Sequence, residues 1–345
     1  MKLSTSLSYA ADPREGVHRA VELERAGIDM FWVPEAYSFD AVSILGYLAA
    51  HTERAELASG ILPIYSRTPS LTAMTAAGLD AISGGRFVLG IGASGPQVIE
   101  GFHGVPYDRP LQRTRELIEI SRKLWRRERL EHDGEVYQLP LPPEQGTGLG
   151  KPLKLINHPV REQIPIYVAS LGPKNVAMTA ELAEGWLPVF FHPDRAHEVW
   201  GEDLERGKQR RAPELGELEI VAGGAVEICD EHRATELRDQ ARPMTALYVG
   251  GMGSRDRNFY NNVFRRYGYE AEAEKIQELY LSGHKREAEE AVPDDFLRAT
   301  VLAGDEGFVR DRVQAYEAAG VTRLSITPTG DDPEGTIARL KKWTS

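Results

Sequence analysis

Cysteine is nearly absent from this chain of 345 residues, in which Cys229 is the only one. A single cysteine excludes an intrachain disulfide and a multi-cysteine metal site, and such usage is typical of a reducing compartment. Long apolar runs are missing as well, because the longest uncharged segment, residues 87–99, is shorter than the ~20 residues that span a bilayer. Residues 1–9 contain one lysine and lack the apolar core of a signal peptide. We therefore expect a cytoplasmic protein with no membrane partner.

The charge balance is acidic, with 41 lysine and arginine residues against 52 aspartate and glutamate residues and a net charge of −11. A nucleic-acid partner requires a basic face, so this balance argues against one. It does not exclude a small anionic ligand, because a loop of backbone N–H groups binds phosphate without net positive charge.

Three kinds of catalytic pattern are also absent. There is no Gly-x-Ser-x-Gly nucleophile elbow, no His-x-x-x-His pair with the spacing of metal ligands, and no pair of carboxylates where the candidate strands end. We therefore expect no metal site. A site without a nucleophile or a metal points to a cofactor that carries the chemistry.

What the sequence does contain is a regular alternation of short apolar strands and amphipathic helices, joined mostly by short connections. This alternation predicts a parallel sheet. Eight candidate strands cover residues 2–8, 28–33, 55–61, 86–91, 164–169, 186–190, 218–228 and 323–327. Because each is followed by a helical pattern, we predict an α/β fold of the TIM (β/α)8 barrel class, which typically takes about 250 residues.

The remaining residues belong to two insertions. One, at about 130–165, is rich in proline and glycine and follows the fourth strand and its helix. The other, at about 231–298, reads as several helices in series and precedes the eighth strand. No tandem repeat and no linker divides the chain, so we expect residues 1–345 to form a single barrel domain.

The most distinctive stretch is residues 84–104, where the fourth strand is bounded by glycines and opens into a loop of small residues. The spelling Gly90-x-Gly92-x-x-Gly95 matches the dinucleotide-binding fingerprint, but Pro96 and a second glycine cluster interrupt the helix that this fingerprint requires. Three interpretations stay open: a ligand-binding loop, a Rossmann turn, and a tight turn that binds nothing.

The carboxyl ends of barrel strands meet on one face of the molecule, which is where barrels bind their ligands. In this chain these ends supply Glu35, Ser94, Gly95, the small-residue loop 170–175 and Trp186. The set contains two loops that can hold phosphate through backbone N–H groups, but only one carboxylate. It indicates a large ligand cradle with few reactive side chains.

Several stretches of the sequence resemble the luciferase-like superfamily of barrel oxidoreductases, and within it the actinobacterial branch that uses coenzyme F420, a deazaflavin. The resemblance covers most of residues 1–190 and is looser over 231–298. The stretches that carry it are Trp32–Tyr37, Ala58–Pro63 with Ser66–Pro69, Arg86–His103, Gly148–Lys154, Ile166–Asn175 and Glu184–Pro188.

The resemblance implies hydride transfer between coenzyme F420 and a small organic substrate. It implies that the third strand bulges through a cis peptide bond at Gly60–Ile61, which backs the deazaflavin ring. Ser94 and Gly95 would line the ring and its ribityl chain, and Trp186 would close the edge of the site. The loop that would hold the cofactor phosphate at a helix N-terminus consists of Ala169, Ser170, Leu171, Gly172, Pro173, Lys174 and Asn175.

Two residues are candidates for catalysis, Glu35 and His103, and each has a structural alternative. Glu35, which is also a candidate cofactor ligand, could cap the next helix, and His103 could be an ordinary loop residue. Arg67 could reach the acidic tail of the cofactor or pair with a nearby carboxylate. The superfamily's sugar-phosphate dehydrogenases carry an acid–His pair where this chain has Glu35-Ala36, so the proton donor stays unassigned.

Two other functions remain open: an FMN-dependent monooxygenase on the same barrel, and a non-catalytic protein that only binds the cofactor. The superfamily commonly pairs its barrels through early helices. Residues Phe39–Thr52 have more apolar residues than one core-facing stripe requires, so we expect a homodimer that uses this helix.

Overall fold

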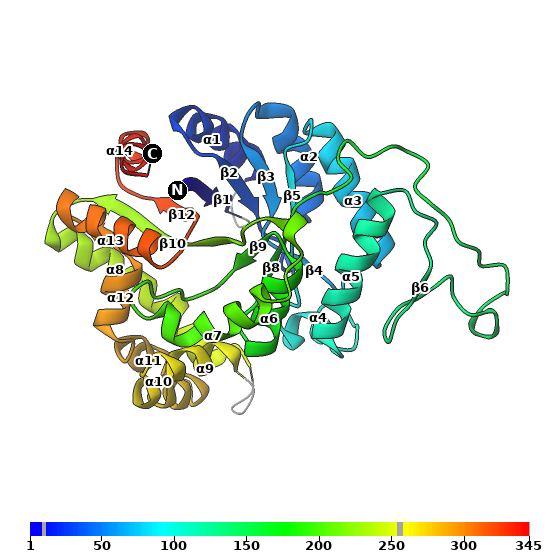
Figure 1. The fold of residues 1–345 in the computed structure, drawn as a ribbon. Coiled ribbons are helices and arrows are strands. Elements are labelled where there is room, and N and C mark those ends of the chain that lie inside the picture. Colours follow the sequence, from blue (N-terminus) through cyan, green and yellow to red (C-terminus); the bar gives the residue numbers. More distant parts are fainter. Residues whose placement is uncertain (9–11, 254–257, 345) are drawn as a thin grey trace.

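The computed structural model, which describes residues 1–8, 12–253 and 258–344, is a closed barrel of eight parallel strands (Figure 1). Around the barrel the order is β9–β10–β12–β1–β2–β3–β5–β8, and the β8–β9 pairing closes it. The predicted TIM barrel is therefore confirmed. The strands are β1 (Lys2–Ser6), β2 (Met30–Val33), β3 (Glu56–Ser59), β5 (Phe87–Gly92), β8 (Ile166–Ala169), β9 (Gly185–Leu187), β10 (Glu219–Ile228) and β12 (Arg323–Pro328).

Helices surround the barrel, and several of them begin at capping residues that are recognisable in the sequence. Asp12, Asp40 and Thr68 accept a hydrogen bond from a first-turn N–H of α1, α2 and α3, and proline occupies the first turn of α1 and α3. The outer helices are α1 (Pro13–Ala26), α2 (Ala41–His51), α3 (Pro69–Ile82), α5 (Pro110–Trp125), α6 (Pro173–Leu182), α7 (Ala196–Lys208), α13 (Glu306–Ala318) and α14 (Pro333–Trp343).

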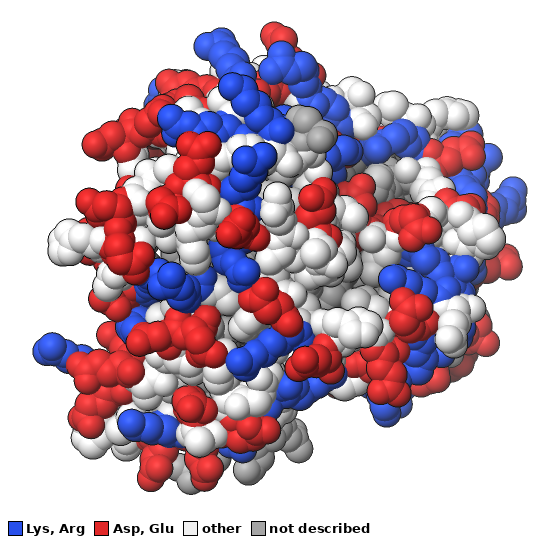
Figure 2. Space-filling view, turned by 60° about the vertical axis from the view of Figure 1, so that its left-hand side comes forward, with Lys and Arg blue, Asp and Glu red and all other residues white. Residues whose placement is uncertain are grey.

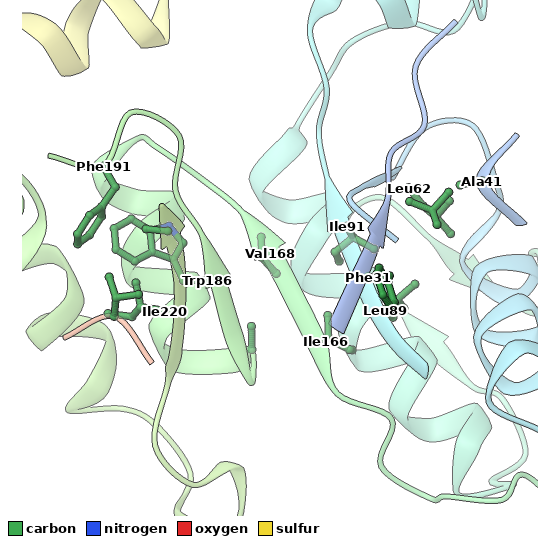
Figure 3. Close-up of a cluster of buried hydrophobic side chains, with 14 of the residues drawn as sticks. Phe31, Ala41, Leu62, Leu89, Ile91, Ile166, Val168, Trp186, Phe191 and Ile220 are labelled. Atoms are coloured by element: carbon green, nitrogen blue, oxygen red, sulfur yellow. The ribbon is translucent and has the colours of Figure 1, made fainter. Parts of the chain in front are cut away.

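Side chains alternate between the two faces of the barrel wall. Met30 and Trp32 of β2 point into the barrel, where they pack with Tyr167, whereas Phe31 and Val33 face the surrounding helices. Figure 3 shows the outer layer, in which side chains of β5 and β8 lie next to each other. The interior is a packed core, so the space for a ligand lies at the end of the barrel.

The third strand is interrupted by a bulge, as the resemblance implied. Leu57 and Ala58 pair with Phe87 and Val88, but the next pairing joins Leu62 of β4 (Leu62–Pro63) to Ile91. The third strand therefore advances four residues while β5 advances three. The peptide bond at Gly60–Ile61 is cis, as expected.

The first insertion is an arm that leaves the barrel after α5 and extends away from it (Figure 1). It contains a short hairpin, β6 (His132–Asp133) with β7 (Gln138–Leu139), and the 3-10 turn η1 (Pro143–Gln145). The buried carboxylate of Glu116 on α5 holds the hairpin by accepting hydrogen bonds from the backbone N–H groups of residues 135–137. Beyond the hairpin, the arm exposes apolar residues, with Ile156 95% exposed.

The second insertion is helical, as predicted, and its helices pack on one another. It consists of α8 (Glu231–Ala246), η3 (Leu247–Gly251), α9 (Phe259–Arg266), α10 (Glu270–Leu281), α11 (Lys285–Glu290) and α12 (Asp294–Thr300). Two elements were not predicted from the sequence. One is β11 (Leu302–Gly304), which pairs with the end of β10 outside the barrel, and the other is α4 (Pro96–Gly101), a short helix after β5.

The exposed apolar residues are only partly where the sequence suggested. Ile44, Leu45 and Leu48 of α2 are buried within the chain, whereas Phe39, at the start of the predicted segment 39–52 and before α2, is 58% exposed. On the neighbouring α3, Met74 is 54% and Ile82 62% exposed, and Leu71 lies on the same face. The surplus apolar surface expected on α2 is therefore found on α3.

Charged side chains of both signs are interspersed over the face in Figure 2, and no large area there carries a single sign. None of the helices in the described residues is both long and apolar enough to cross a lipid bilayer. In the same part of the chain, no cluster of three or more His, Cys, Asp or Glu side chains is arranged to hold a metal ion.

Candidate active site

The candidate site lies where the third, fourth and fifth barrel strands end, and Gly92 is at its centre. Gly92 pairs with Pro63 on one side and with Ala169 on the other. A Cβ atom added to Gly92 would lie 3.2 Å from both the Ala169 Cβ and the Ile61 side chain. The bulge, the loop after β5 and the loop after β8 are therefore side by side, as the sequence predicted for parallel strands.

Two buried tryptophans fix the loop after β8. The Trp186 indole N–H donates to the Ser170 carbonyl at 2.9 Å, and the Trp200 indole N–H donates to the Leu171 carbonyl at 3.3 Å. The two rings pack edge to face, with centroids 5.2 Å apart. Figure 3 shows Trp186 next to Phe191 and close to Ile220 of β10.

These two hydrogen bonds also determine where the loop's N–H groups point. In a trans peptide the N–H lies opposite the carbonyl of the preceding residue. Because the Ser170 and Leu171 carbonyls face the buried tryptophans, the N–H groups of Leu171 and Gly172 face the other way. Among the described hydrogen bonds, none uses either N–H group as a donor. These two donors precede the N-terminus of α6, which carries a partial positive charge.

The other residues of this loop lie on either side of the two unpaired N–H groups. The Ser170 hydroxyl is buried against the Thr179 hydroxyl at 2.9 Å, so Ser170 acts through its backbone. Pro173 and Lys174 are exposed at the start of α6. The side-chain amide of Asn175 makes no hydrogen bond among the described residues, although its oxygen is buried. The donors that suit an anion in this loop are therefore the unpaired N–H groups of Leu171 and Gly172.

Trp186 has a different position from the one expected. Its side chain is fully buried, so it supports the loop from inside the protein rather than lining the edge of the site. The sequence placed it at a strand end but could not show that residue 186 points into the wall, between β9 and α7. Trp200, which sequence analysis did not single out, has the equivalent role from α7.

The bulge and the loop after β5 form the opposite wall. Gly60 lies over Trp32, and an added Cβ would be 3.2 Å from the Trp32 Cβ. The Ser59 hydroxyl donates to the Gly90 carbonyl and accepts from its N–H, which replaces the ladder bonds lost at the bulge. Gly90 has to be glycine, because an added Cβ would be only 1.8 Å from the Ser59 carbonyl oxygen.

Ser94 and Gly95 follow directly at the end of β5. Ser94 has φ 58°, a left-handed conformation that is uncommon for a residue with a side chain, and its side chain is exposed. The Tyr107 hydroxyl donates to the Ser94 carbonyl at 3.3 Å and fixes this part of the loop. Both residues therefore border the space next to Gly92.

Both carboxylate oxygens of Glu35 accept hydrogen bonds. Arg67 donates to them at 2.5 and 2.9 Å, and the Ala41 N–H at the start of α2 donates to one of them at 2.9 Å. The Glu35 side chain is 8% exposed and that of Arg67 is 14% exposed. Of the alternatives left open by the sequence, this geometry favours a helix cap for Glu35 and an ion pair for Arg67.

His103 is half-buried in the loop after α4, and its Nε2 atom has no hydrogen-bond partner among the described residues. Its ring contacts Phe102, which in turn lies near Tyr37 from the loop after β2, with ring centroids 6.2 Å apart. His103 and Glu35 thus belong to neighbouring loops, and no described hydrogen bond joins them. An unpaired buried ring nitrogen requires an explanation, and a bound substrate would provide one.

An aromatic cluster from the helical insertion covers this end of the barrel, and sequence analysis missed its role. Phe190, at φ 57°, contacts Tyr248, Tyr260, Phe264 and Phe296 with centroids 5.5–6.0 Å apart. Burial raises the pKa of Tyr260, and the proximity of Tyr248 and Tyr107 raises it further. The aromatic spacing of 259–264 was the available signal, but helical spacing alone cannot identify which surface a helix covers.

Comparisons with known proteins agree with this architecture. The chain is 41% identical over 346 residues to a Mycobacterium tuberculosis protein, Rv3520c, which is named provisionally as a coenzyme F420-dependent oxidoreductase; the match covers 99% of each chain. It is 29% identical to a 5,10-methylenetetrahydromethanopterin reductase of Archaeoglobus fulgidus, covering 92% of this chain and 91% of the relative.

Among solved structures, the fold matches a coenzyme F420-dependent tetrahydromethanopterin reductase from Methanopyrus kandleri. The TM-score is 0.79 at 24% identity, and the match covers 98% of this chain and 96% of the other. At this identity the likeness concerns the fold alone. The model of the family described as luciferase-like monooxygenase matches residues 1–323. The chain therefore belongs to the luciferase-like monooxygenase family.

Proposed function

We propose that this protein is an oxidoreductase that transfers a hydride between coenzyme F420 and a small organic substrate. The observation that carries the proposal is the loop after β8, whose unpaired Leu171 and Gly172 N–H groups follow two and three residues after Ala169, which borders Gly92 together with Ile61 of the bulge. This combination provides a loop for the cofactor phosphate next to the bulge, against which the deazaflavin ring would lie. The provisional name of the relative with 41% identity supports the same cofactor.

The residues fit this cofactor in specific ways. Gly172 has open space where a side chain would be, so a phosphate can approach the backbone there. Ala169 and Ile61 border the space beside Gly92, and Ser94 and Gly95 extend it. When bound, coenzyme F420 supplies a ring carbon that gives or accepts the hydride.

The protein's own contribution is orientation, exclusion of water and the handling of one proton. The bulge and the loop after β5 would hold the ring and its ribityl chain, and the aromatic cluster around Phe190 would keep water away from the substrate. His103 is the candidate for a proton donor or acceptor, because its Nε2 atom has no partner within the described residues.

An FMN-dependent monooxygenase is the second candidate, because the family description names that activity. A titration of the purified protein with coenzyme F420 and with FMN, followed by fluorescence, tests the choice. We expect saturable binding of F420 and no oxygen consumption after reduction, since a deazaflavin does not activate oxygen. Tight FMN binding with oxygen consumption would overturn the proposal, and F420 binding without turnover of any acceptor would indicate a non-catalytic binder.

We further propose that the protein is a cytoplasmic homodimer. The exposed face of α3, formed by Leu71, Met74 and Ile82, supports this assembly because it is a continuous apolar stripe on one helix. Gly78 lies between these residues with open space above it, so a partner helix can approach closely. We expect α2 to contribute only through its contact with α3.

A further inference from the structure

A pocket of about 150 Å³ opens directly beyond the loop after β8. One side consists of the same loop residues that carry the unpaired N–H groups, and the other side is α9 of the helical insertion. Its lining residues are Leu171, Gly172, Pro173, Phe259, Asn262, Val263 and Arg266. The pocket therefore begins where the phosphate of the cofactor would lie and extends from there to α9.

The charges around this pocket are predominantly positive. Nη2 of Arg266 donates to the Val199 carbonyl and lies 3.3 Å from the Asp203 carboxylate. Arg206 donates to the same carboxylate at 2.6 Å and reaches the Pro173 carbonyl at 3.4 Å. Asp203 is thus shared by two arginines, and the exposed Lys174 adds a third cation next to Pro173.

Arg266 is held in place by one nitrogen and keeps the others available. Its Nη2 makes both described contacts, to the Val199 carbonyl and to Asp203, so Nε and Nη1 have no acceptor among the described residues. Both parallel pairs of N–H groups on a guanidinium include Nη2, so the free Nε and Nη1 groups point in different directions. Each can donate one charge-assisted hydrogen bond to a carboxylate. Asn262, one turn earlier on α9, offers a side-chain amide to the same pocket.

We propose that this pocket binds the first glutamate of the acidic tail of coenzyme F420, with Arg266 as its ion-pair partner and Asn262 as a hydrogen-bond donor. This inference rests on the proposed function, because FMN ends at its phosphate whereas F420 continues beyond it. It also gives the helical insertion a function, since α9 supplies one side of the cofactor site.

The test is a comparison of three ligands by fluorescence titration: the deazaflavin with only its ribityl chain, F420 without glutamates, and F420 with two or more glutamates. We expect the glutamates to improve the affinity of the unaltered protein by about tenfold. In Arg266→Gln this gain should disappear, while the dissociation constants of the two ligands without glutamates stay within about twofold. The gain should also shrink as the salt concentration rises.

Two variants complete the experiment. Arg265→Gln is the matched control, because Arg265 is on the same helix, bonds to Asn261 and does not line the pocket; it should keep the tail preference. Asn262→Asp adds a negative charge to the pocket without touching the contact between Arg266 and Val199, so it should reverse the preference even if Arg266→Gln folds poorly.

The outcomes separate the two proposals. If the unaltered protein binds F420 with and without glutamates equally well, or if Asn262→Asp keeps the tail preference, the pocket is not a tail site and the proposed function stands. If none of the three deazaflavin ligands binds, both the proposed function and the tail site are wrong.

Discussion

At the scale of single residues, Gly172 is the position where ligand binding and folding are most clearly separated. Its φ of −75° is one that any residue adopts, and no atom lies within 4 Å of an added Cβ. We expect Gly172→Val to weaken F420 binding at least tenfold, about 1.4 kcal/mol, because the side chain would occupy the phosphate site. The melting temperature of the cofactor-free protein should stay nearly unchanged.

The matched control is Gly16→Val on α1, where an added Cβ meets only the end of Leu7. This variant should keep the dissociation constant of the unaltered protein. An unchanged constant in Gly172→Val as well would remove the loop after β8 from the cofactor site.

Glu35 and His103 allow a paired prediction. Glu35→Gln leaves the buried Arg67 without its bidentate partner, so it should lower the free energy of unfolding by about 1–3 kcal/mol and leave turnover within tenfold. His103→Gln should do the reverse, because Nε2 has no structural partner in the described residues: turnover should fall about 100-fold with the melting temperature nearly unchanged.

Chemical denaturation and steady-state kinetics with an accepted substrate measure both effects. A loss of turnover of 100-fold or more in Glu35→Gln, with F420 affinity within a few-fold, would instead assign the acid–base role to Glu35.

The sequence predicted the loop residues of the site better than the groups that hold them. Residues 169–175 and the Gly60–Ile61 bond could be found because small residues at strand ends form a local pattern, and the resemblance named the bond. The indole donors from Trp186 and Trp200, and the Arg67 partner of Glu35, come from other elements. Such pairings depend on tertiary packing, which no local pattern encodes.

At the scale of elements, the contact of α1 with the start of β3 depends on one buried carboxylate. Glu24 accepts from the N–H groups of Glu53, Arg54 and Ala55, at 2.7 Å for the last two. Burial alone would raise the pKa of Glu24, but these backbone donors outweigh it and lower the pKa below its ordinary value. The charged form therefore stabilises the fold, fully above the unfolded pKa of about 4.5 and less as the pH falls through the folded pKa.

We expect Glu24→Gln to lower the free energy of unfolding at pH 7 by about 1–3 kcal/mol. Because the variant has no carboxylate to protonate, its difference from the unaltered protein should shrink as the pH falls below about 4.5. Urea denaturation at pH 7, 5 and 4 measures this difference. A difference that grows in acid would contradict the account.

Element types followed from the sequence where hydrophobic periodicity and caps agreed, as in α1 and α3. The prediction was weakest where pairing over a long distance decides the structure. Residues 302–304 form β11 only because the end of β10 extends past the barrel and offers an edge, and β9 ends at Leu187 rather than at residue 190. Three-residue strands carry too little pattern to be recognised alone.

At the scale of the whole molecule, a measurement of particle mass tests the proposed homodimer. We expect a particle of twice the chain mass of 38.3 kDa by light scattering at micromolar concentration. Met74→Glu combined with Ile82→Glu should yield a monomer, because charges would be buried against the partner's apolar stripe. Leu281→Glu, on exposed α10, is the control and should leave the dimer intact.

The two tryptophans behind the loop after β8 have a consequence for the speed of cofactor capture. Their hydrogen bonds to the Ser170 and Leu171 carbonyls are made within the barrel wall, so the loop acquires its shape when the barrel folds. The loop therefore loses its conformational entropy when the protein folds. Binding of the cofactor does not incur this loss again. Encounters with the cofactor do not have to wait for a rare loop conformation, and the rate of capture should follow cofactor concentration without reaching a plateau.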